Sequence, residues 1–366
     1  MTAVLHVIDA TADATLLQSL RELRDGLRAI GEPFHLCSVN GPAAARAEQW
    51  LGERVHRAEL RLRTFGICRL AAVVRRTGAR LLHAWGVEAA QASAARLPET
   101  PLVLSLGDSS ALAGAERWIR RFPTDAAVLV PSGSLAARLI RAGIAREWTV
   151  VVPPWLERRP LDRSARRGQS DPSPPDGNAS PRGPVLLLHG PPSRLGGQFH
   201  GMWTAAVLRQ VCGDLRLVMP YASREGERVR RLAERTRIPD LLTVPEEDRG
   251  WPDLLADADL FLMPALDEVH LGPLLAAMAA GVPTAASSLA SIRDWITDEQ
   301  DGLLFEAGNA KAAARQVLRL LDDECLGRQL ADHARRRAAA IESPVRAAER
   351  HTRIYQNLLA GRPPAA

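Results

Sequence analysis

The sequence of 366 residues predicts an α/β protein built from two doubly wound domains. Three observations lead to this prediction. The length is typical of two domains rather than one. Short apolar strands alternate with amphipathic helical segments on both sides of one polar break. The strands are continuously apolar rather than alternating, which indicates burial on both faces and therefore parallel sheets.

The first domain is predicted to cover residues 1–160 and to be Rossmann-like. Its amphipathic helices are expected at 16–31, 67–78 and 135–144. Its apolar strands are expected at 4–9, 34–39, 80–86, 101–107, 126–132 and 148–154.

The polar break is LDRSARRGQSDPSPPDGNASPRGP, residues 161–184. It is rich in Pro, Ser, Gly and charge and has almost no apolar residue, so it cannot form a core and is predicted to be a flexible linker. Asn178, Ala179 and Ser180 match a glycosylation acceptor. Without a secretion signal we regard that match as chance.

The second domain, residues 185–342, repeats the alternation. Its strands are expected at 184–190, 214–220, 241–245, 258–264 and 282–288, with helices between them. Residues 343–366 are expected to form a closing helix, for which packing back on the first domain is one option. Two such domains predict a cleft between them, and in doubly wound folds ligands bind beyond the carboxyl ends of the strands.

Composition narrows the functional classes. No apolar run approaches the ~20 residues that span a bilayer, and the N-terminus lacks a signal peptide pattern, so a cytoplasmic protein is expected. The four cysteines have no paired spacing and are expected to be reduced thiols. Residues 1–160 hold 21 Arg against 15 Asp and Glu. This excess would suit peripheral contact with an anionic membrane, at its inner face, or with an anionic acceptor; a solvated basic surface is the favoured interpretation. Sparse aromatic residues and the lack of a recognition motif argue against nucleic acid.

One stretch, DEVHLGPLLAAMAAGVPTAAS at residues 267–287, predicts a phosphate site. Gly272 and Pro273 begin a helix directly after a strand, and Gly281 ends it. The first turn, Gly272, Pro273, Leu274 and Leu275, would present backbone N–H groups and the positive end of the helix dipole to a diphosphate. Glu268 stands just before this helix, beside the sugar end of such a donor, unless it is merely a solvated loop acid.

The residues of this region resemble the donor domain of retaining GT-B glycosyltransferases of family 4. The C-terminal matches are Glu268, Ala277-Met278-Ala279, Gly281, Pro283 and Asp301-Gly302-Leu303-Leu304. The N-terminal matches are looser: Leu82-His83-Ala84-Trp85, Pro131-Ser132, Ala142-Gly143-Ile144 and Val150-Val151-Val152-Pro153.

This resemblance implies retaining transfer of a sugar from a nucleoside diphosphate sugar to a glycan, lipid or small-molecule acceptor, with no metal ion required. It implies that Glu268 contacts the donor sugar. It also implies that Gly190, Ser193 and Arg194 bind the donor together with the helix start at Gly272–Leu275. Residues 1–160 would be the acceptor side.

Several positions depart from the family pattern. Ala276 replaces a second Glu that would accept the ribose hydroxyls. In the loop 189–201, Pro191 stands at the position of a diphosphate-binding Arg and Gly196 near that of a Lys, so Arg194 is the only cation there. In the first domain Gly107 replaces a His, and Asp108 beside it is the remaining catalytic candidate. The loop 9–15 lacks a Gly-Gly pair. These departures leave open a second hypothesis, a non-catalytic relative that binds glycan, nucleotide or protein.

Other candidates are weaker. Asp257 and Asp259 match a metal-binding Asp-x-Asp pattern, but a solvated acid pair at a helix end is favoured. His83 and His189 end predicted strands, where a histidine is more often a local hydrogen-bonding partner than a catalyst. No spacing typical of a zinc site or a Ser-His-Asp triad is present.

Overall fold

The computed structural model describes residues 3–10, 12–39, 43–58, 65–112, 118–119, 122–123, 125–157, 183–191, 193–220, 224–245 and 251–364. The chain divides into two compact units, Met1–Glu157 with Glu342–Ala366 (unit 1) and Arg158–Ile341 (unit 2). The predicted linker and its glycosylation-like triplet lie outside the described residues, apart from the last two linker residues.

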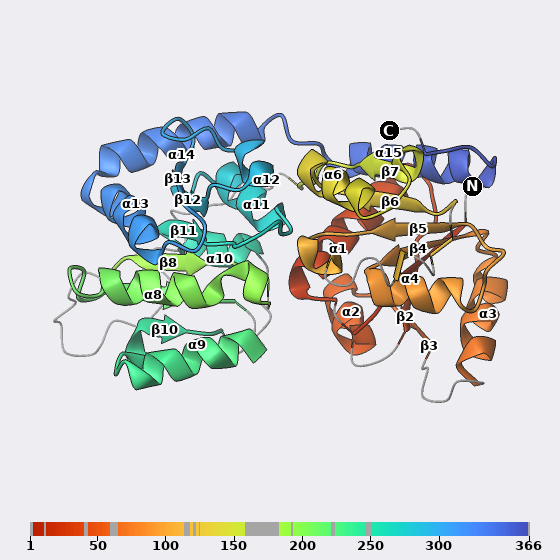
Figure 1. Cartoon of the computed structure of the whole chain (residues 1–366), viewed down its shortest axis with the longest axis horizontal. Coiled ribbons are helices and arrows are strands. Elements are labelled where there is room, and N and C mark those ends of the chain that lie inside the picture. The colour runs from red at the N-terminus through yellow and green to blue at the C-terminus, as the bar shows by residue number, and fades with distance from the viewer. Residues whose placement is uncertain are drawn as a thin grey trace. The chain divides into compact units, whose positions relative to one another are not determined.

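The described part of unit 1 contains one parallel sheet with the strand order β3-β2-β1-β4-β5-β6-β7 (Figure 1). In this order the strands are His56–Ala58, His35–Val39, Val4–Ile8, Leu81–Trp85, Leu102–Ser105, Ala127–Val130 and Thr149–Val151. The helices of unit 1 are α1 (Ala14–Ala29), α2 (Ala43–Leu51), α3 (Phe65–Thr77), α4 (Val87–Ala94), α6 (Gly133–Arg141) and α15 (Pro344–Leu359). Short 3₁₀ turns are η1 (Ser109–Leu112) and η2 (Arg146–Trp148).

The described part of unit 2 also contains one parallel sheet, with the order β10-β9-β8-β11-β12-β13. These strands are Leu242–Thr243, Arg216–Val218, Val185–Leu188, Leu260–Met263, Thr284–Ser287 and Leu303–Phe305. The helices are α8 (Gln198–Leu208), α9 (Arg224–Arg235), α10 (Trp251–Asp257), α11 (Gly272–Ala280), α12 (Ala290–Arg293), α13 (Ala310–Asp322) and α14 (Glu324–Ala338), with 3₁₀ turns η3 (Arg194–Gly196) and η4 (Pro239–Leu241). The predicted α/β class with parallel sheets is confirmed in both units.

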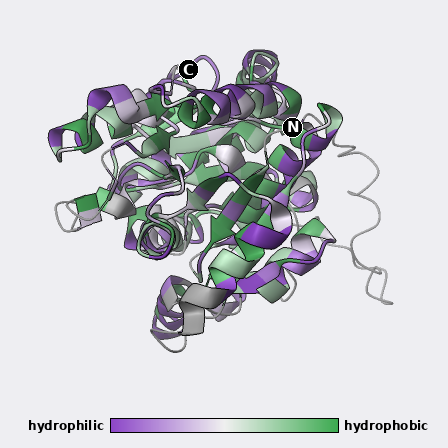
Figure 2. Ribbon diagram, turned by 90° about the vertical axis from the view of Figure 1, so that its right-hand side faces the viewer, coloured by the Kyte–Doolittle hydropathy of each residue, from purple (hydrophilic) through white to green (hydrophobic). Residues whose placement is uncertain are grey.

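Burial on both sheet faces explains the continuous apolar strands. In β1, Leu5 and Val7 belong to one core cluster, whereas Val4 and Ile8 belong to clusters that include residues of helices α15 and α1. Because successive side chains of a strand point to opposite faces, a strand covered on both faces needs an apolar residue at every position. Figure 2 shows this distribution, with green strands inside and purple residues on the surrounding helices.

The C-terminal helix α15 packs along α1 in unit 1. Their approach is close at Gly26 of α1, where an added Cβ would overlap the carbonyl oxygen of Pro344. Tyr355 and Ile354 of α15 are fully buried in the same core as Leu81 and Val103. The last helix is therefore an integral part of the first unit.

We expect Gly26→Ala to lower the free energy of unfolding by about 1–3 kcal/mol, because the methyl group would push α15 from α1. On propensity alone the same change would stabilise a helix. Gly133→Ala in α6 is the matched control, since an added Cβ there meets no atom within 4 Å. Urea midpoints of both variants and the wild type measure the difference. A Gly26→Ala protein as stable as Gly133→Ala would contradict the proposed packing.

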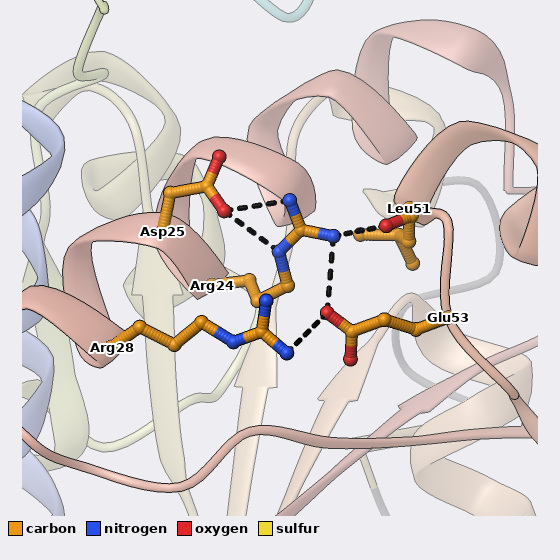
Figure 3. Close-up of polar contacts among 5 residues, drawn as sticks. All are labelled: Arg24, Asp25, Arg28, Leu51 and Glu53. Atoms are coloured by element: carbon orange, nitrogen blue, oxygen red, sulfur yellow. Dashed lines mark hydrogen bonds and ion pairs between the residues drawn. The ribbon is translucent and has the colours of Figure 1, made fainter.

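A buried arginine joins α1 to α2 (Figure 3). The Arg24 guanidinium donates to Asp25 Oδ1 at 2.8 and 2.6 Å and to the carbonyl oxygen of Leu51, the last residue of α2. It also lies 3.2 Å from Glu53 Oε1, which Arg28 approaches at 2.6 Å. A cation at a helix C-terminus satisfies the terminal carbonyls and the negative end of the dipole. This contact fixes α2 against α1.

Among the described residues, no helix is long and apolar enough to cross a membrane.

Candidate functional site

The carboxyl edge of the unit 2 sheet gathers most of the predicted site residues. The parallel strands β8, β11, β12 and β13 all end there. The loops that follow them contain Gly190–Arg194, Asp267–Leu271, Ser288 and Glu306. The fold thus brings Glu268, the β8–α8 loop and the start of α11 to one edge of one sheet, where ligands of doubly wound folds bind.

Glycines shape the loop between β8 and α8. A Cβ on Gly190 would overlap the carbonyl oxygen of Gly196, and one on Gly196 would overlap that of Pro191. Gly197 has φ +68°, and a Cβ there would overlap the carbonyl of Pro264. The loop therefore folds tightly on itself and lies against the end of β11, with the Leu266 N–H donating to the Leu195 carbonyl at 2.7 Å. Gly196, which stands near the position of the Lys in the family pattern, has a steric reason to be glycine.

This loop offers polar groups without protein partners. Ser193 Oγ and Gln198 Oε1 are buried and have no hydrogen-bond partner among the described residues. The other end of the Gln198 amide donates to the Gly190 carbonyl at 2.8 Å, which fixes the amide orientation. Arg194 is exposed in η3 and forms no ion pair with any residue that the structure describes. A hydroxyl, an amide oxygen and a guanidinium thus remain for a ligand.

Glu268 is 6% exposed, so it is not the solvated loop acid of the alternative interpretation. The backbone N–H of Glu268 also has a protein partner, because it donates to Asp267 Oδ1 at 2.8 Å. A buried carboxylate loses its hydration, and such a group is retained where other groups or a ligand stabilise its charge. Its position between β11 and α11 is the one predicted from the sequence.

At the start of α11 the backbone donors are partly occupied. The Gly272 N–H donates to His270 Nδ1 at 3.1 Å, and the Leu275 N–H donates to the Leu271 carbonyl at 3.0 Å. Pro273 has no N–H, so Leu274 supplies the other backbone donor of the first turn. Pro273, Leu274 and Leu275 are buried. Gly281 ends the helix at φ +64°, as predicted.

His189 follows β8 and is 2% exposed. Burial, together with the nearby His270, lowers the pKa of His189 to about 3. Its ring stacks on Phe261, with centroids 6.5 Å apart. His189 is therefore a neutral imidazole at neutral pH and part of the wall behind the site.

Arg293 is a site residue that the sequence interpretation missed. It ends α12 and donates from Nη1 to the carbonyl oxygen and to Oγ of Ser288, at 3.2 and 3.1 Å. It is exposed and forms no ion pair within the described part of the chain. In the sequence, the feature that could have indicated Arg293 is its position in a helix that directly follows a predicted strand. Arg293 is thus a second cation on the carboxyl edge, held in place through one nitrogen.

An open groove of about 690 Å³ lies beside Arg293 on the β12 and β13 side of this edge. Its polar lining includes Asp298 and Glu306, whose carboxylates accept hydrogen bonds from Leu304 N–H and Asn309. Ser287 Oγ and Ser291 Oγ, nearby in sequence, are buried without a hydrogen-bond partner among the described residues. The groove combines a cation with acceptors of hydroxyl hydrogen bonds, which suits a polyhydroxylated or anionic ligand.

Two acidic candidates have structural roles. Asp301 is buried, accepts from the Thr297 N–H at 2.7 Å and pairs with Arg337 at 2.8 Å. Asp259 accepts from the Val185 N–H at 2.9 Å, at the opposite edge of the sheet from the candidate site. In the described ranges no group of three or more His, Cys, Asp or Glu side chains is placed to hold a metal ion.

Asp108 lies in unit 1, in the loop after β5. Its Oδ1 accepts a hydrogen bond from the N–H of Ser110, in the first turn of η1, at 2.8 Å. Asp13, the N-cap of α1, has a pKa raised to about 6. Burial is the main cause, and the negative charge of Asp108 raises this pKa further. The loop 9–15 is thus built around a helix cap in place of the family's Gly-Gly pair. His83, also in unit 1, is fully buried and bonded to Tyr355 and Ser105.

Comparison with known proteins shows which proteins the segment around this sheet edge is similar to. Residues 204–323 match the family described as "Glycosyl transferases group 1". A segment of 122 residues is 30% identical to N-acetyl-alpha-D-glucosaminyl L-malate synthase of Bacillus anthracis, covering 33% of this chain and 32% of that enzyme. The alignment therefore spans about a third of the length of this curated relative.

Solved structures match over nearly the whole chain. Anabaena HepE in complex with UDP-glucose superposes with a TM-score of 0.78 at 15% identity, covering 98% of this chain and 99% of that one. Sucrose-phosphate synthase of Thermosynechococcus elongatus superposes with a TM-score of 0.74 at 18% identity, covering 98% and 100%. At such identities the likeness establishes the fold. Residues 204–323 of unit 2 are thus similar to the glycosyl transferases group 1 family, and the two parallel sheets of the chain have the architecture of GT-B glycosyltransferases.

Proposed function

We propose that this protein transfers a sugar from a nucleoside diphosphate sugar to a glycan, lipid or small-molecule acceptor, with retention of configuration. The observation that carries the proposal is the buried carboxylate of Glu268, set between β11 and the start of α11 on the carboxyl edge of unit 2. The glycosyl transferases group 1 match includes this segment. The relative of B. anthracis is named a synthase that joins a glucosaminyl group to malate, which supports a transferase reaction.

In this proposal the donor lies across the loops after β8 and β11. The Leu274 N–H and the dipole of α11 face the diphosphate, and Ser193 and Gln198 offer a hydroxyl and an amide to it. Arg194 supplies the positive charge that the leaving diphosphate requires, since Pro191 occupies the family's Arg position. Arg293 is the second available cation. Charge neutralisation is thereby assigned to arginine, without a metal ion.

Glu268 is assigned to the sugar. A carboxylate there accepts hydrogen bonds from sugar hydroxyls and stabilises the positive charge that develops on the sugar ring as the bond to phosphate breaks. Retention by front-face attack uses a donor phosphate oxygen as the base for the acceptor hydroxyl, so it requires few protein acids. Asp108 is kept as a weaker catalytic candidate. We propose a cytoplasmic site of action, at the inner face of the membrane if the acceptor is a lipid.

Isothermal titration of the whole chain with UDP, GDP and UDP-glucose tests the proposal. UDP is the first choice because the matching HepE structure contains UDP-glucose. We expect a dissociation constant in the micromolar range, about −8 kcal/mol, for at least one nucleotide. Arg194→Gln should weaken this binding, whereas Arg146→Gln, in η2 of unit 1, should leave it unchanged. No nucleotide binding at millimolar concentration would refute a donor site.

A non-catalytic binding protein is the second candidate function. The observation in its favour is Ala276, a half-buried residue of α11 that occupies the position of the family's second Glu. An alanine accepts no hydrogen bond from the ribose hydroxyls. Nucleotide binding without donor hydrolysis or transfer would select this alternative.

Restoring the missing acid should strengthen nucleotide binding. We expect Ala276→Glu to lower the dissociation constant for UDP about tenfold, since a hydrogen bond to a charged acceptor contributes ~1.5–3 kcal/mol and solvent weakens it at a half-buried position. Ala280→Glu, one helical turn further along α11, is the matched control and should leave UDP affinity unchanged. Equal affinities of both variants would place the ribose away from residue 276.

A further inference from the structure

Helix α8 of unit 2 presents an apolar stripe to solvent. Trp203 is 42% exposed and Val207 is 46% exposed, and Val211 in the following turn is 67% exposed. A spacing of four residues places successive side chains on one helix face. Only two other large apolar side chains in the described chain are comparably exposed, Val151 and Val345, and both belong to unit 1. The stripe is therefore a local concentration of exposed apolar groups rather than average surface.

The helices on both sides of this stripe carry a net positive charge. The residues of α8, QFHGMWTAAVL, include no Asp, Glu, Lys or Arg. The helix lies between α9, with five arginines against three glutamates, and α13, with three cations against one aspartate (Figure 1). The Arg228 guanidinium of α9 lies 5.4 Å from the centre of the Phe199 ring on α8 and pairs with Glu225 through one nitrogen, at 2.7 Å. On the other side, Thr204 Oγ1 donates to the Ala310 carbonyl at 3.4 Å, next to Lys311.

We propose that the α8 surface, formed by Trp203, Val207 and Val211 and bordered by Arg228 and Lys311, docks on an anionic lipid bilayer. An interfacial helix places apolar side chains at the boundary of head groups and acyl chains while cations pair with lipid phosphates. Tryptophan is favoured at that depth because its ring is amphipathic. The proposal is independent of sugar transfer, and it places the membrane contact in unit 2 instead of the basic first 160 residues.

The charge distribution argues against a second copy of the chain on this surface. A symmetric contact through α8 would bring α9 and α13 of one copy, both with excess positive charge, against those of the other. Three exposed side chains are also few for a stable protein interface, which buries ~800 Å² on each partner. A bilayer with anionic head groups supplies the complementary charge.

Flotation of the whole chain with lipid vesicles tests the proposal. We expect binding to vesicles of phosphatidylcholine with phosphatidylglycerol, and little binding to phosphatidylcholine alone. The double variant Trp203→Ser with Val207→Ser should bind anionic vesicles at least about tenfold more weakly, because it removes the apolar contribution of two side chains. The double variant Val151→Ser with Val345→Ser removes exposed apolar groups of unit 1 and should bind like the wild type.

A second measurement tests the orientation. Lys311 is the only lysine of the chain, so its reaction with an amine-directed reagent, followed by mass spectrometry, reports on this surface alone among the lysines. We expect anionic vesicles to slow its labelling several-fold, and high salt to abolish the protection. Absence of binding to anionic vesicles, equal loss in both double variants, or unchanged Lys311 labelling on bound protein would each overturn the proposal. Dimerisation that Trp203→Ser with Val207→Ser abolishes would assign the surface to a second copy and overturn it as well.

Discussion

Between pH 6.5 and pH 5, the free energy of unfolding of unit 1 should fall by about 5 kcal/mol, with a slope that approaches roughly 4 kcal/mol for each pH unit at the acid end. Three fully buried histidines, His6, His83 and His351, cause this loss. Burial, together with the mutual repulsion of their charged forms, lowers the pKa of His6 to about 3 and that of His83 well below its usual value. Burial and the nearby Arg350 lower the pKa of His351 to about 4.

The direction follows from proton binding. Each histidine binds a proton near pH 6.5 in the unfolded chain and only at a clearly lower pH in the folded one, so the unfolded state binds more protons across the range between. Stability is therefore complete above pH 6.5 and decreases as the pH falls. The three rings lie in contact: His83 is centred 5.2 Å from His6 and 5.7 Å from His351. Protonation of one thus further disfavours the next.

The hydrogen bonds of this cluster fix neutral rings. Trp85 Nε1 donates to His6 Nδ1 at 3.1 Å, so His6 accepts there, and its other nitrogen is buried without a partner in the described residues. His351 Nδ1 donates to the Ala347 carbonyl at 2.7 Å. His83 is bonded to Tyr355 and Ser105, both at 2.7 Å. None of these hydrogen-bond partners is a carboxylate, so a second proton on any of the three rings gains no opposite charge from them.

Urea unfolding of the whole chain at pH 7.5, 6 and 5 measures the loss, and His351→Phe isolates one histidine. This variant keeps an aromatic ring in the cluster but loses a hydrogen bond, which should cost about 1 kcal/mol at pH 7.5. Because phenylalanine cannot bind a proton, the free energy of unfolding of His351→Phe should fall by about a third less per pH unit than that of the wild type. The variant should therefore be more stable than the wild type at pH 5. His333→Gln, at a partly exposed histidine of α14, is the control. Parallel stability curves for His351→Phe and the wild type would refute the prediction.

The sequence predicted the buried strands well because their apolar residues alone determine them. Strands β1, β4 and β11 agree with the predicted ranges within one or two residues at each end. Strands β3 and β13 were missed, since a strand of three residues, such as His56–Ala58, is too short to show a period. The histidine cluster was also missed. His6, His83 and His351 are distant in sequence: the pairing of β1 with β4 sets His6 beside His83, and the packing of α15 adds His351.

In the candidate site too, features set by neighbouring residues were predictable from the sequence, and features set by tertiary packing were not. The predicted helix start at Gly272 and its end at Gly281 depend on neighbouring residues, and the structure has both. The burial of Glu268 and the bond from Gly272 to His270 depend on how the loop folds back, which the local pattern does not encode. Arg293 escaped notice because its relation to Ser288 depends on the packing of α12 at the end of β12.

The largest effect on activity is expected from Glu268→Gln. We expect this variant to lower kcat for donor hydrolysis and transfer at least about 100-fold, because one preorganised charge at a reacting centre contributes roughly 3 kcal/mol or more to the transition state. Glutamine keeps the size and one hydrogen-bond acceptor of the buried side chain but not its charge. Initial rates with a UDP-sugar, in parallel with calorimetry with UDP, measure the two effects separately.

The affinity for UDP should stay unchanged in Glu268→Gln, since the proposal places this carboxylate at the sugar and not at the nucleotide. Glu324→Gln is the control: Glu324 is an exposed acid of α14 in the same unit, and its loss should not lower kcat 100-fold. If Glu268→Gln instead weakens UDP binding and leaves kcat intact, the carboxylate belongs to the nucleotide subsite. If the wild type binds UDP but neither protein turns over any donor, the buried charge stabilises a bound ligand without chemistry, and the binding-protein hypothesis accounts for Ala276 as well.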